Sequence, residues 1–269
     1  VKNEIKKSEP EKKGGTSRPT KKDYEKIPLD KIKMPDGFKI EIFAEGIDRA
    51  RSLAFSPKET LFVGTMSKKG VVTAVKNGQQ YKLSKGWEMP NGVAFKDGDL
   101  YVAEVSRIHK FEDIENNLDD PKEEVIYDKY PTDTHHGWKF ISFGPDGKLY
   151  VPVGAPCNIC EKEEEIYASI TRINPDGTGL EIVQKGIRNT VGFTWHPDND
   201  ELWFTDNGRD WWGDDTPGCE VNHATKDGMH FGYPYCHQGD ALDPEFGKAG
   251  DCEKYTAPVQ NLGAHVAPL

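Results

Sequence analysis

The sequence lacks several features that would assign the chain to a common class of protein. It has no run of eighteen apolar residues, which a membrane-spanning helix needs, and no initiating Met or signal peptide. The motifs G-x-G-x-x-G, the P-loop and G-x-S-x-G are absent, so NAD, ATP and serine-hydrolase chemistry has no support. The formal net charge of −10 argues against nucleic acid as a partner, because phosphates attract basic proteins. We expect no membrane span and no nucleic acid.

The five cysteines are few enough to consider one at a time. Cys157 and Cys160 form a C-x-x-C motif without a second such pair, so a zinc site has weak support. Cys236 and Cys252 bracket a polar loop of the kind that a disulfide pins well. We predict that both pairs are disulfides, which favours an oxidising compartment and a periplasmic or secreted protein. Cys219 is then either free or paired with a cysteine outside this chain.

The composition changes near residue 35. Residues 1–34 are polar and rich in Lys and Glu, and we predict a disordered tail and lead-in because few apolar residues are present to bury. Residues 35–269 are predicted to form a single domain. The glycines, prolines and aromatic residues of this part are typical of a turn-dense β protein.

A hairpin pattern recurs four times in this domain. Each copy has an apolar run, a tight turn and a second apolar run. Further strand candidates follow the hairpins, and about four short strands per repeat is typical of the blades of a β-propeller. The four hairpins are Ser52–Thr65, Gly92–Glu104, Phe140–Gly154 and Gly192–Asn207.

The predicted fold class is all-β, a six-bladed β-propeller of which about four blades are readable in this chain. The alternating segment Gly37–Gly46 predicts a further strand. Residues 208–269 show no fifth hairpin and are expected to be loop-like. Because each blade needs neighbours to bury its faces, we expect a C-terminal segment or a second polypeptide to complete the ring.

Two unrepeated motifs lie in loops that enter the hairpins. His135 and His136 precede the third hairpin, and a histidine needs only a modest pKa shift to act as a general base near neutral pH. Arg188 and Asn189 precede the fourth, and a guanidinium beside an amide suits a planar, oxygen-rich anion. The residues alone leave two alternatives open: a histidine bonded to backbone, and an arginine paired with a carboxylate.

A third motif is the acidic run from Asp206 to Asp210. Carboxylate and carbonyl oxygens in a flexible loop suit Ca²⁺. The run lacks the spacing of an EF-hand, so a solvated acidic loop is the stronger alternative on the residues alone.

Four runs of this chain, taken in order, resemble the sorbosone dehydrogenase branch of the soluble quinoprotein sugar dehydrogenases. The runs are HHGWKFISFGPDGKLYVPVGAPCNIC, GIRNTVGFTWHP, LWFTDNGRDWWGDD and HFGYPYCHQGDALDPEFG. The resemblance covers about Pro35 to Leu269. It implies a six-bladed β-propeller that uses pyrroloquinoline quinone (PQQ) and Ca²⁺.

The resemblance also implies a role for individual residues. His136 is implied to be the catalytic base, which takes the proton of the substrate hydroxyl while a hydride passes to C5 of the quinone. Arg188 and Asn189 are implied to contact the quinone oxygens, and Arg188 to stabilise the charge of the reduced cofactor. The backbone carbonyls of Gly208 and Arg209 match those that hold Ca²⁺, a Lewis acid on the C5 carbonyl.

Asn91 matches a cofactor-contacting Gln of the family. This chain departs from the family in two respects. Val191 stands where glucose-oxidising relatives have Gln, and the basic residues for the PQQ carboxylates come from two last blades that this chain does not encode. Since a tricarboxylate without cationic partners binds weakly, we expect a competent enzyme only when those blades are supplied.

Three functions are compatible with the sequence. The first is a quinoprotein oxidoreductase that oxidises an aldose or related hydroxyl or aldehyde substrate and passes electrons to an external acceptor such as a cytochrome. The second is a metal-dependent, lactonase-like hydrolase on a propeller, with Glu104, Asn189 and Asp206 as ligands. The third is a non-catalytic propeller fragment that acts as a binding or assembly module.

Overall fold

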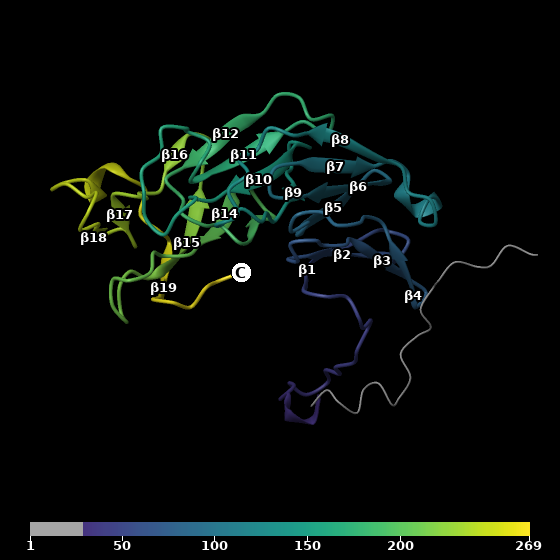
Figure 1. Cartoon of the computed structure of the whole chain (residues 1–269). Helices are drawn as coiled ribbons and strands as arrows, with labels where there is room; N and C mark the ends of the chain where they lie inside the picture. Colours follow the sequence, from purple (N-terminus) through teal and green to yellow (C-terminus); the bar gives the residue numbers. More distant parts are fainter. Residues whose placement is uncertain (1–28) are drawn as a thin grey trace, which may run out of the picture.

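The computed structural model describes residues 29–269, so most of the predicted tail lies outside the described residues. Within them the regular elements are β-strands, apart from three short 3₁₀ turns: η2 (Leu29–Lys31), η3 (Ile114–Asn116) and η4 (Cys252–Lys254). Four successive sheets follow one another around an arc as the blades of a propeller (Figure 1). The predicted all-β fold with four readable blades is therefore confirmed.

Blades 1 and 2 are regular antiparallel sheets whose strands follow one another in chain order. Blade 1 consists of β1 (Ala50–Phe55), β2 (Leu61–Thr65), β3 (Thr73–Lys76) and β4 (Gln79–Lys82). Blade 2 consists of β5 (Gly92–Lys96), β6 (Asp99–Ala103), β7 (Ile108–Phe111) and β8 (Glu123–Tyr127).

Blades 3 and 4 are joined by long connections. Blade 3 consists of β9 (Ser142–Phe143), β10 (Leu149–Val153), β11 (Ser169–Ile173) and β12 (Glu181–Lys185), with β16 (Met229–His230) added parallel to β12. Blade 4 consists of β13 (Phe193–Trp195), β14 (Leu202–Asp206), β15 (Cys219–Ala224) and β19 (Gln260–Gly263). A separate small hairpin consists of β17 (Cys236–His237) and β18 (Ala241–Leu242).

The expectation that residues 208–269 are loop-like is wrong. The third and fourth strands of blade 4, β15 and β19, both lie in this part of the chain and pair with each other. The segment that contains β16, β17 and β18 separates them, so the spacing that marks the earlier blades is lost. A strand at a blade edge can arrive from far along the sequence because its pairing depends on its neighbour in space.

The predicted strand Gly37–Gly46 is also wrong, because no strand forms there in the structure. Its two phenylalanines are largely exposed, Phe38 at 71% and Phe43 at 57%, whereas Ala44 packs against the core of blade 1. Alternation shows which residues share one face, but a strand also needs a neighbouring strand to pair its backbone groups.

The hydrophobic core consists mainly of three layers, each between two successive blades. Strands β10 and β2 are buried along their whole length, as strands with packed faces on both sides must be. Rings from neighbouring blades meet in each layer: Phe62 with Phe95 at 5.8 Å, Tyr101 with Phe143 at 4.9 Å, and Phe140 with Phe193 at 5.1 Å. These layers fix the angle between blades and so position the loops at the centre of the arc.

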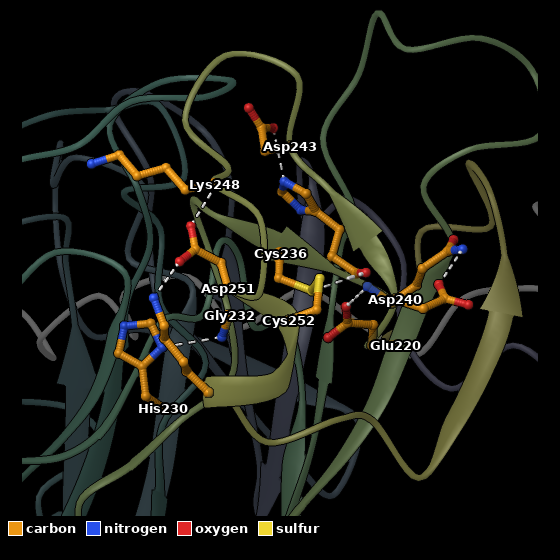
Figure 2. Close-up of a disulfide and its surroundings, with 12 residues drawn as sticks. Glu220, His230, Gly232, Cys236, Asp240, Asp243, Lys248, Asp251 and Cys252 are labelled. Atoms are coloured by element: carbon orange, nitrogen blue, oxygen red, sulfur yellow. Dashed lines mark hydrogen bonds and ion pairs between the residues drawn. A yellow bond between two sulfur atoms is a disulfide. The ribbon is translucent and has the colours of Figure 1, made fainter.

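Both predicted disulfides form, between Cys157 and Cys160 and between Cys236 and Cys252. The second ties β17 to η4 and so pins the small hairpin beside blade 4 (Figure 2). Cys219 is free and buried at the start of β15. In the described part of the chain, no helix is long and apolar enough to cross a membrane.

Candidate active site

A cavity of about 310 Å³ collects the loops that enter blades 3 and 4. Four of the predicted site residues line it: His136, Arg188, Asn189 and Gly208. Residues more than 70 positions apart in the sequence therefore share one cavity, which is the convergence expected at the centre of a propeller.

Asn91 and Arg209 lie outside the lining of this cavity. Asn91 is fully buried, and its Nδ2 donates to the carbonyl oxygen of Lys139 at 2.8 Å. It lines an adjacent cavity of about 590 Å³ that is mostly apolar. The Arg209 guanidinium binds Asp243 at 2.8 Å and Glu245 at 2.7 Å, so only its backbone could serve a ligand.

His136 lies in the loop before β9 with its Nδ1 2.8 Å from the carbonyl oxygen of Ala155. Since a carbonyl can only accept, Nδ1 carries the proton, and Nε2 of the neutral ring keeps a free lone pair. Burial, the charge of Arg188 and the neighbouring His135 lower the pKa of His136 to about 3. The ring is therefore neutral at physiological pH. His135 is exposed, with its ring centroid 4.1 Å from that of His136.

His136 adopts a left-handed backbone conformation, with φ of 52°, which costs free energy in a residue other than glycine. The adjacent backbone holds this shape. The Lys139 ammonium is fully buried and donates to the carbonyl oxygen of Gly137 at 3.0 Å. Burial lowers the pKa of Lys139 to about 7. A buried lysine thus anchors the loop that presents His136.

The guanidinium of Arg188 is 4% exposed and is fixed by backbone and side-chain oxygens. Its Nε donates to the carbonyl oxygen of Asn158 at 2.8 Å, and its Nη2 donates to Oδ1 of the same residue at 2.9 Å. Its Nη1 donates to the carbonyl oxygen of Asn207 at 3.0 Å. Burial lowers the pKa of Arg188, but a guanidinium remains charged at neutral pH. The side chain is thus held rigidly with its charge at the cavity.

The carboxylate of Asp206 holds the backbone of Arg188 and Asn189. Its two carboxylate oxygens accept the backbone N–H groups of Arg188 at 2.8 Å and Asn189 at 2.6 Å. Glu220 lies opposite Asp206 in the β14–β15 ladder. Burial raises the pKa of both carboxyl groups, and the charge of Asp206 raises that of Glu220 further. The acidic run therefore begins with a buried carboxylate that binds two backbone N–H groups. The alternative of a solvated acidic loop does not hold for Asp206.

Several polar groups in the lining of the cavity or next to it have no protein partner within residues 29–269. They are the side-chain amide of Asn189 and the carbonyl oxygens of Gly208 and Arg209. No cluster of three His, Cys, Asp or Glu side chains that could hold a metal occurs in the described chain. A cation at this site would therefore rest on backbone carbonyls and on an anionic ligand.

The two carboxylate ligands of the hydrolase alternative are already occupied. Glu104 accepts the backbone N–H of Glu88 at 2.7 Å, and its other oxygen lies 2.7 Å from Nε2 of the buried His109. The Asp206 carboxylate is committed to two backbone N–H groups. Neither carboxylate is available to a metal ion without breaking these bonds.

Sequence reasoning missed two residues that shape the site. Asn158 lies between the cysteines of the C-x-x-C motif, and only the partners of its side chain reveal its link to Arg188. Gly154 directly follows β10, and a Cβ there would stand 2.5 Å from the Cβ of His136 and 3.3 Å from the carbonyl oxygen of Arg188. The glycine was visible in the sequence, but the close approach was not.

Residues 94–268 match the family model of glucose/sorbosone dehydrogenase. The chain belongs to this family. A curated protein of Borreliella burgdorferi, described as uncharacterized, is 32% identical over 253 residues, which cover 88% of this chain and 66% of that protein. The chain thus spans just under two thirds of the length of this relative.

Three solved structures of similar fold are less than 25% identical in sequence to this chain. A calcium structure of a family AA12 enzyme from Trichoderma reesei has a TM-score of 0.73 at 18% identity, covering 87% of this chain and 73% of that one. The PQQ-bound aldose sugar dehydrogenase of Streptomyces coelicolor has a TM-score of 0.61 at 22% identity, covering 82% and 70%. The holo PQQ domain of a pyranose dehydrogenase from Coprinopsis cinerea has a TM-score of 0.70 at 15% identity, covering 83% and 68%. These similarities support the propeller fold.

Proposed function

We propose that this chain carries the catalytic cavity of a PQQ- and Ca²⁺-dependent dehydrogenase that oxidises an aldose or a related hydroxyl or aldehyde substrate. Membership of the glucose/sorbosone dehydrogenase family supports an oxidoreductase. The PQQ-bound and calcium structures among proteins of similar fold support the two cofactors. Sorbosone is one candidate substrate, in keeping with the family name.

The observation that carries the proposal is the state of His136. Its Nδ1–H is committed to Ala155, so Nε2 is free at a cavity that it shares with Arg188 and Asn189. A neutral imidazole with a free nitrogen can accept the proton of a substrate hydroxyl. In this role His136 is a general base that needs no prior deprotonation at neutral pH.

The residues at the cavity fit an oxygen-rich anionic cofactor. Arg188 brings a buried positive charge, and Asn189 brings an amide without a protein partner. Arg51 lies at the same cavity, with its guanidinium carbon 4.5 Å above the ring of Trp138. Two cationic side chains and one free amide are a donor set suited to the carboxylates and carbonyls of PQQ.

When bound, PQQ with its Ca²⁺ would supply an electrophilic quinone carbon that accepts a hydride. The residues of this chain have four tasks in that reaction. The proton of the substrate hydroxyl goes to Nε2 of His136, and Arg188 stabilises negative charge at the cavity. Asn189 would donate to an oxygen of the ligand, and the carbonyl oxygens of Gly208 and Arg209 would bind the cation.

The wider setting is part of the proposal. An external electron acceptor such as a cytochrome would receive the electrons. A further segment or a second polypeptide would supply the remaining blades and the basic residues for the carboxylates of PQQ. The two disulfides support a periplasmic or secreted location, because such bonds persist in oxidising compartments.

An assay of dye reduction tests the proposal against the hydrolase alternative. The chain, together with the segment or polypeptide that supplies the remaining blades, is incubated with PQQ and Ca²⁺, and reduction of an artificial acceptor is followed with a panel of aldoses and aldehydes. We expect sugar-dependent reduction that requires PQQ. Hydrolysis of lactones that EDTA abolishes, without any dye reduction, would instead favour the hydrolase.

A further inference from the structure

The loop of the Cys157–Cys160 disulfide lies directly against the side chain of Arg188. Asn158, inside this loop, accepts two hydrogen bonds from the guanidinium, through its backbone oxygen and through Oδ1. Arg188 is the buried cation of the candidate site, and this one residue takes bonds from both Nε and Nη2. The position of the guanidinium therefore depends on the conformation of a four-residue ring.

The ring is held from both sides. The Asn158 side chain exchanges two bonds with the backbone of Asp210: Nδ2 donates to its carbonyl oxygen at 3.0 Å, and Oδ1 accepts its N–H at 2.8 Å. On the other side, the Tyr233 hydroxyl accepts the N–H of Cys160 at 3.0 Å and lies 3.5 Å from the sulfur of Cys157. Asn158 thus links the disulfide ring, Arg188 and the loop after Arg209.

The disulfide is reachable from a second cavity that does not include Arg188. This cavity, of about 230 Å³, is lined by Cys160 and Tyr233. Both cysteines are half-buried. A small dithiol can therefore approach the sulfurs without entering the candidate active site.

We propose that Asn158 is a positioning residue for Arg188, and that the Cys157–Cys160 disulfide is a reducible bond that holds Asn158 in place. A dithiol reductant would give two electrons and two protons to the disulfide. The bond between the sulfurs breaks, both cysteines become thiols, and the reductant closes its own disulfide. The loop then gains conformational freedom, and the two bonds to the guanidinium weaken. This proposal rests on the proposed function only in giving Arg188 a cofactor to bind.

Hydrogen exchange of the Arg188 guanidinium N–H groups, at Nε and Nη2, measured by ¹⁵N NMR on the full chain, tests the proposal. The signals are assigned by their loss in Arg188→Lys. We expect slow exchange in the oxidised protein and exchange at least about tenfold faster in Asn158→Ala and in the double variant Cys157→Ala/Cys160→Ala. Asn158→Asp should exchange more slowly than Asn158→Ala, because a carboxylate keeps the acceptor for Nη2 although it loses the donor to Asp210.

Two controls separate this effect from general loosening. Removing the other disulfide, with Cys236→Ala/Cys252→Ala, should leave the Arg188 signals unchanged, because that bond lies beside η4 and β17 (Figure 2). Dithiothreitol should accelerate exchange in wild type but not further in Cys157→Ala/Cys160→Ala. Unchanged exchange in both Asn158→Ala and the Cys157/Cys160 variant would overturn the proposal. So would an Asn158→Asp variant that exchanges as fast as Asn158→Ala.

A titration with PQQ on the same samples separates this proposal from the proposed function. If PQQ binds, Asn158→Ala should weaken its affinity roughly tenfold and Asn158→Asp should restore it. If wild type binds no PQQ while the exchange pattern holds, the proposed function fails and the role of Asn158 stands.

Discussion

Gly154 lies so close to His136 that a Cβ on the glycine would stand 2.5 Å from the Cβ of the histidine. The neighbouring Ala155 bonds to both halves of the site: its carbonyl oxygen accepts from His136, and its N–H donates to the carbonyl oxygen of Arg188 at 2.8 Å. The two residues after β10 therefore set the separation between the candidate base and the candidate cofactor-binding arginine.

Gly154→Ala should damage both stability and activity. The added methyl group must push the His136 loop away, and overpacking of this kind costs about 1–3 kcal/mol. We expect the free energy of unfolding in urea to fall by that amount and kcat to fall with it. The matched control is Gly218→Ala, where the nearest atom to a new Cβ is at 3.4 Å and the loss should be small. Equal effects of the two changes would argue against the close approach.

His136→Ala should abolish turnover while leaving cofactor affinity largely intact. A positioned general base contributes roughly 10²- to 10⁴-fold, so we expect a loss of kcat in that range. PQQ affinity should change little, since Arg188 and Asn189 remain. His135→Ala is the control, because His135 is exposed and has no assigned role. Unchanged kcat in His136→Ala would exclude it as the base.

The low pKa of His136 predicts a dependence of stability on pH. The folded state holds the ring neutral down to about pH 3, whereas the unfolded ring binds a proton below its ordinary pKa of 6.5. In that window the unfolded state binds more protons, so stability falls as pH falls from 6.5 toward 3, by about 1.4 kcal/mol per pH unit for this group. His136→Gln should lose this part of the slope. Urea denaturation at pH 7.5 and pH 5 measures it, and identical slopes would contradict the buried neutral ring.

Lys139 predicts a second dependence, at higher pH. Burial lowers its pKa from 10.5 to about 7, so the unfolded state binds more protons between these values. Stability should therefore rise as pH increases from 7 toward 10.5. Lys139→Met should remove this rise, whereas exposed Lys58→Met should keep it. Thermal unfolding at pH 7 and pH 9.5 compares the three proteins, and a rise that persists in Lys139→Met would refute the assignment.

The sequence predicted the blades well because each one is encoded locally. An apolar run, a turn and another apolar run suffice to define hairpins such as β5–β6, and the repeat places them in register. The prediction from the sequence failed where a strand pairs with a partner that is distant along the chain. The segment Gly37–Gly46 alternates like a strand, but it joins no sheet of the described chain. Strand β19 is the opposite error, a strand where a loop was predicted. It pairs with β15 after a long insertion.

The candidate site was predicted in part for the same reason. His136, Arg188, Asn189 and Gly208 belong to motifs, and the structure brings them to one cavity. Whether they bind PQQ and Ca²⁺ stays a prediction. The hydrogen bonds that hold these side chains in place could not be predicted. The bond between Asn158 and Arg188, for example, joins residues 30 positions apart without any sequence pattern that links them.

The most direct test of the account is a spectroscopic titration of the protein with PQQ in the presence of Ca²⁺. For the wild-type chain with its remaining blades supplied, the proposed cavity predicts a saturable change in PQQ absorbance, with affinity at least about tenfold weaker in Arg188→Met, because Arg188 is the buried cation of this cavity. Removal of Ca²⁺ should also weaken binding. No absorbance change in wild type, or equal affinity in Arg188→Met, would contradict the central claim that this cavity holds the cofactor.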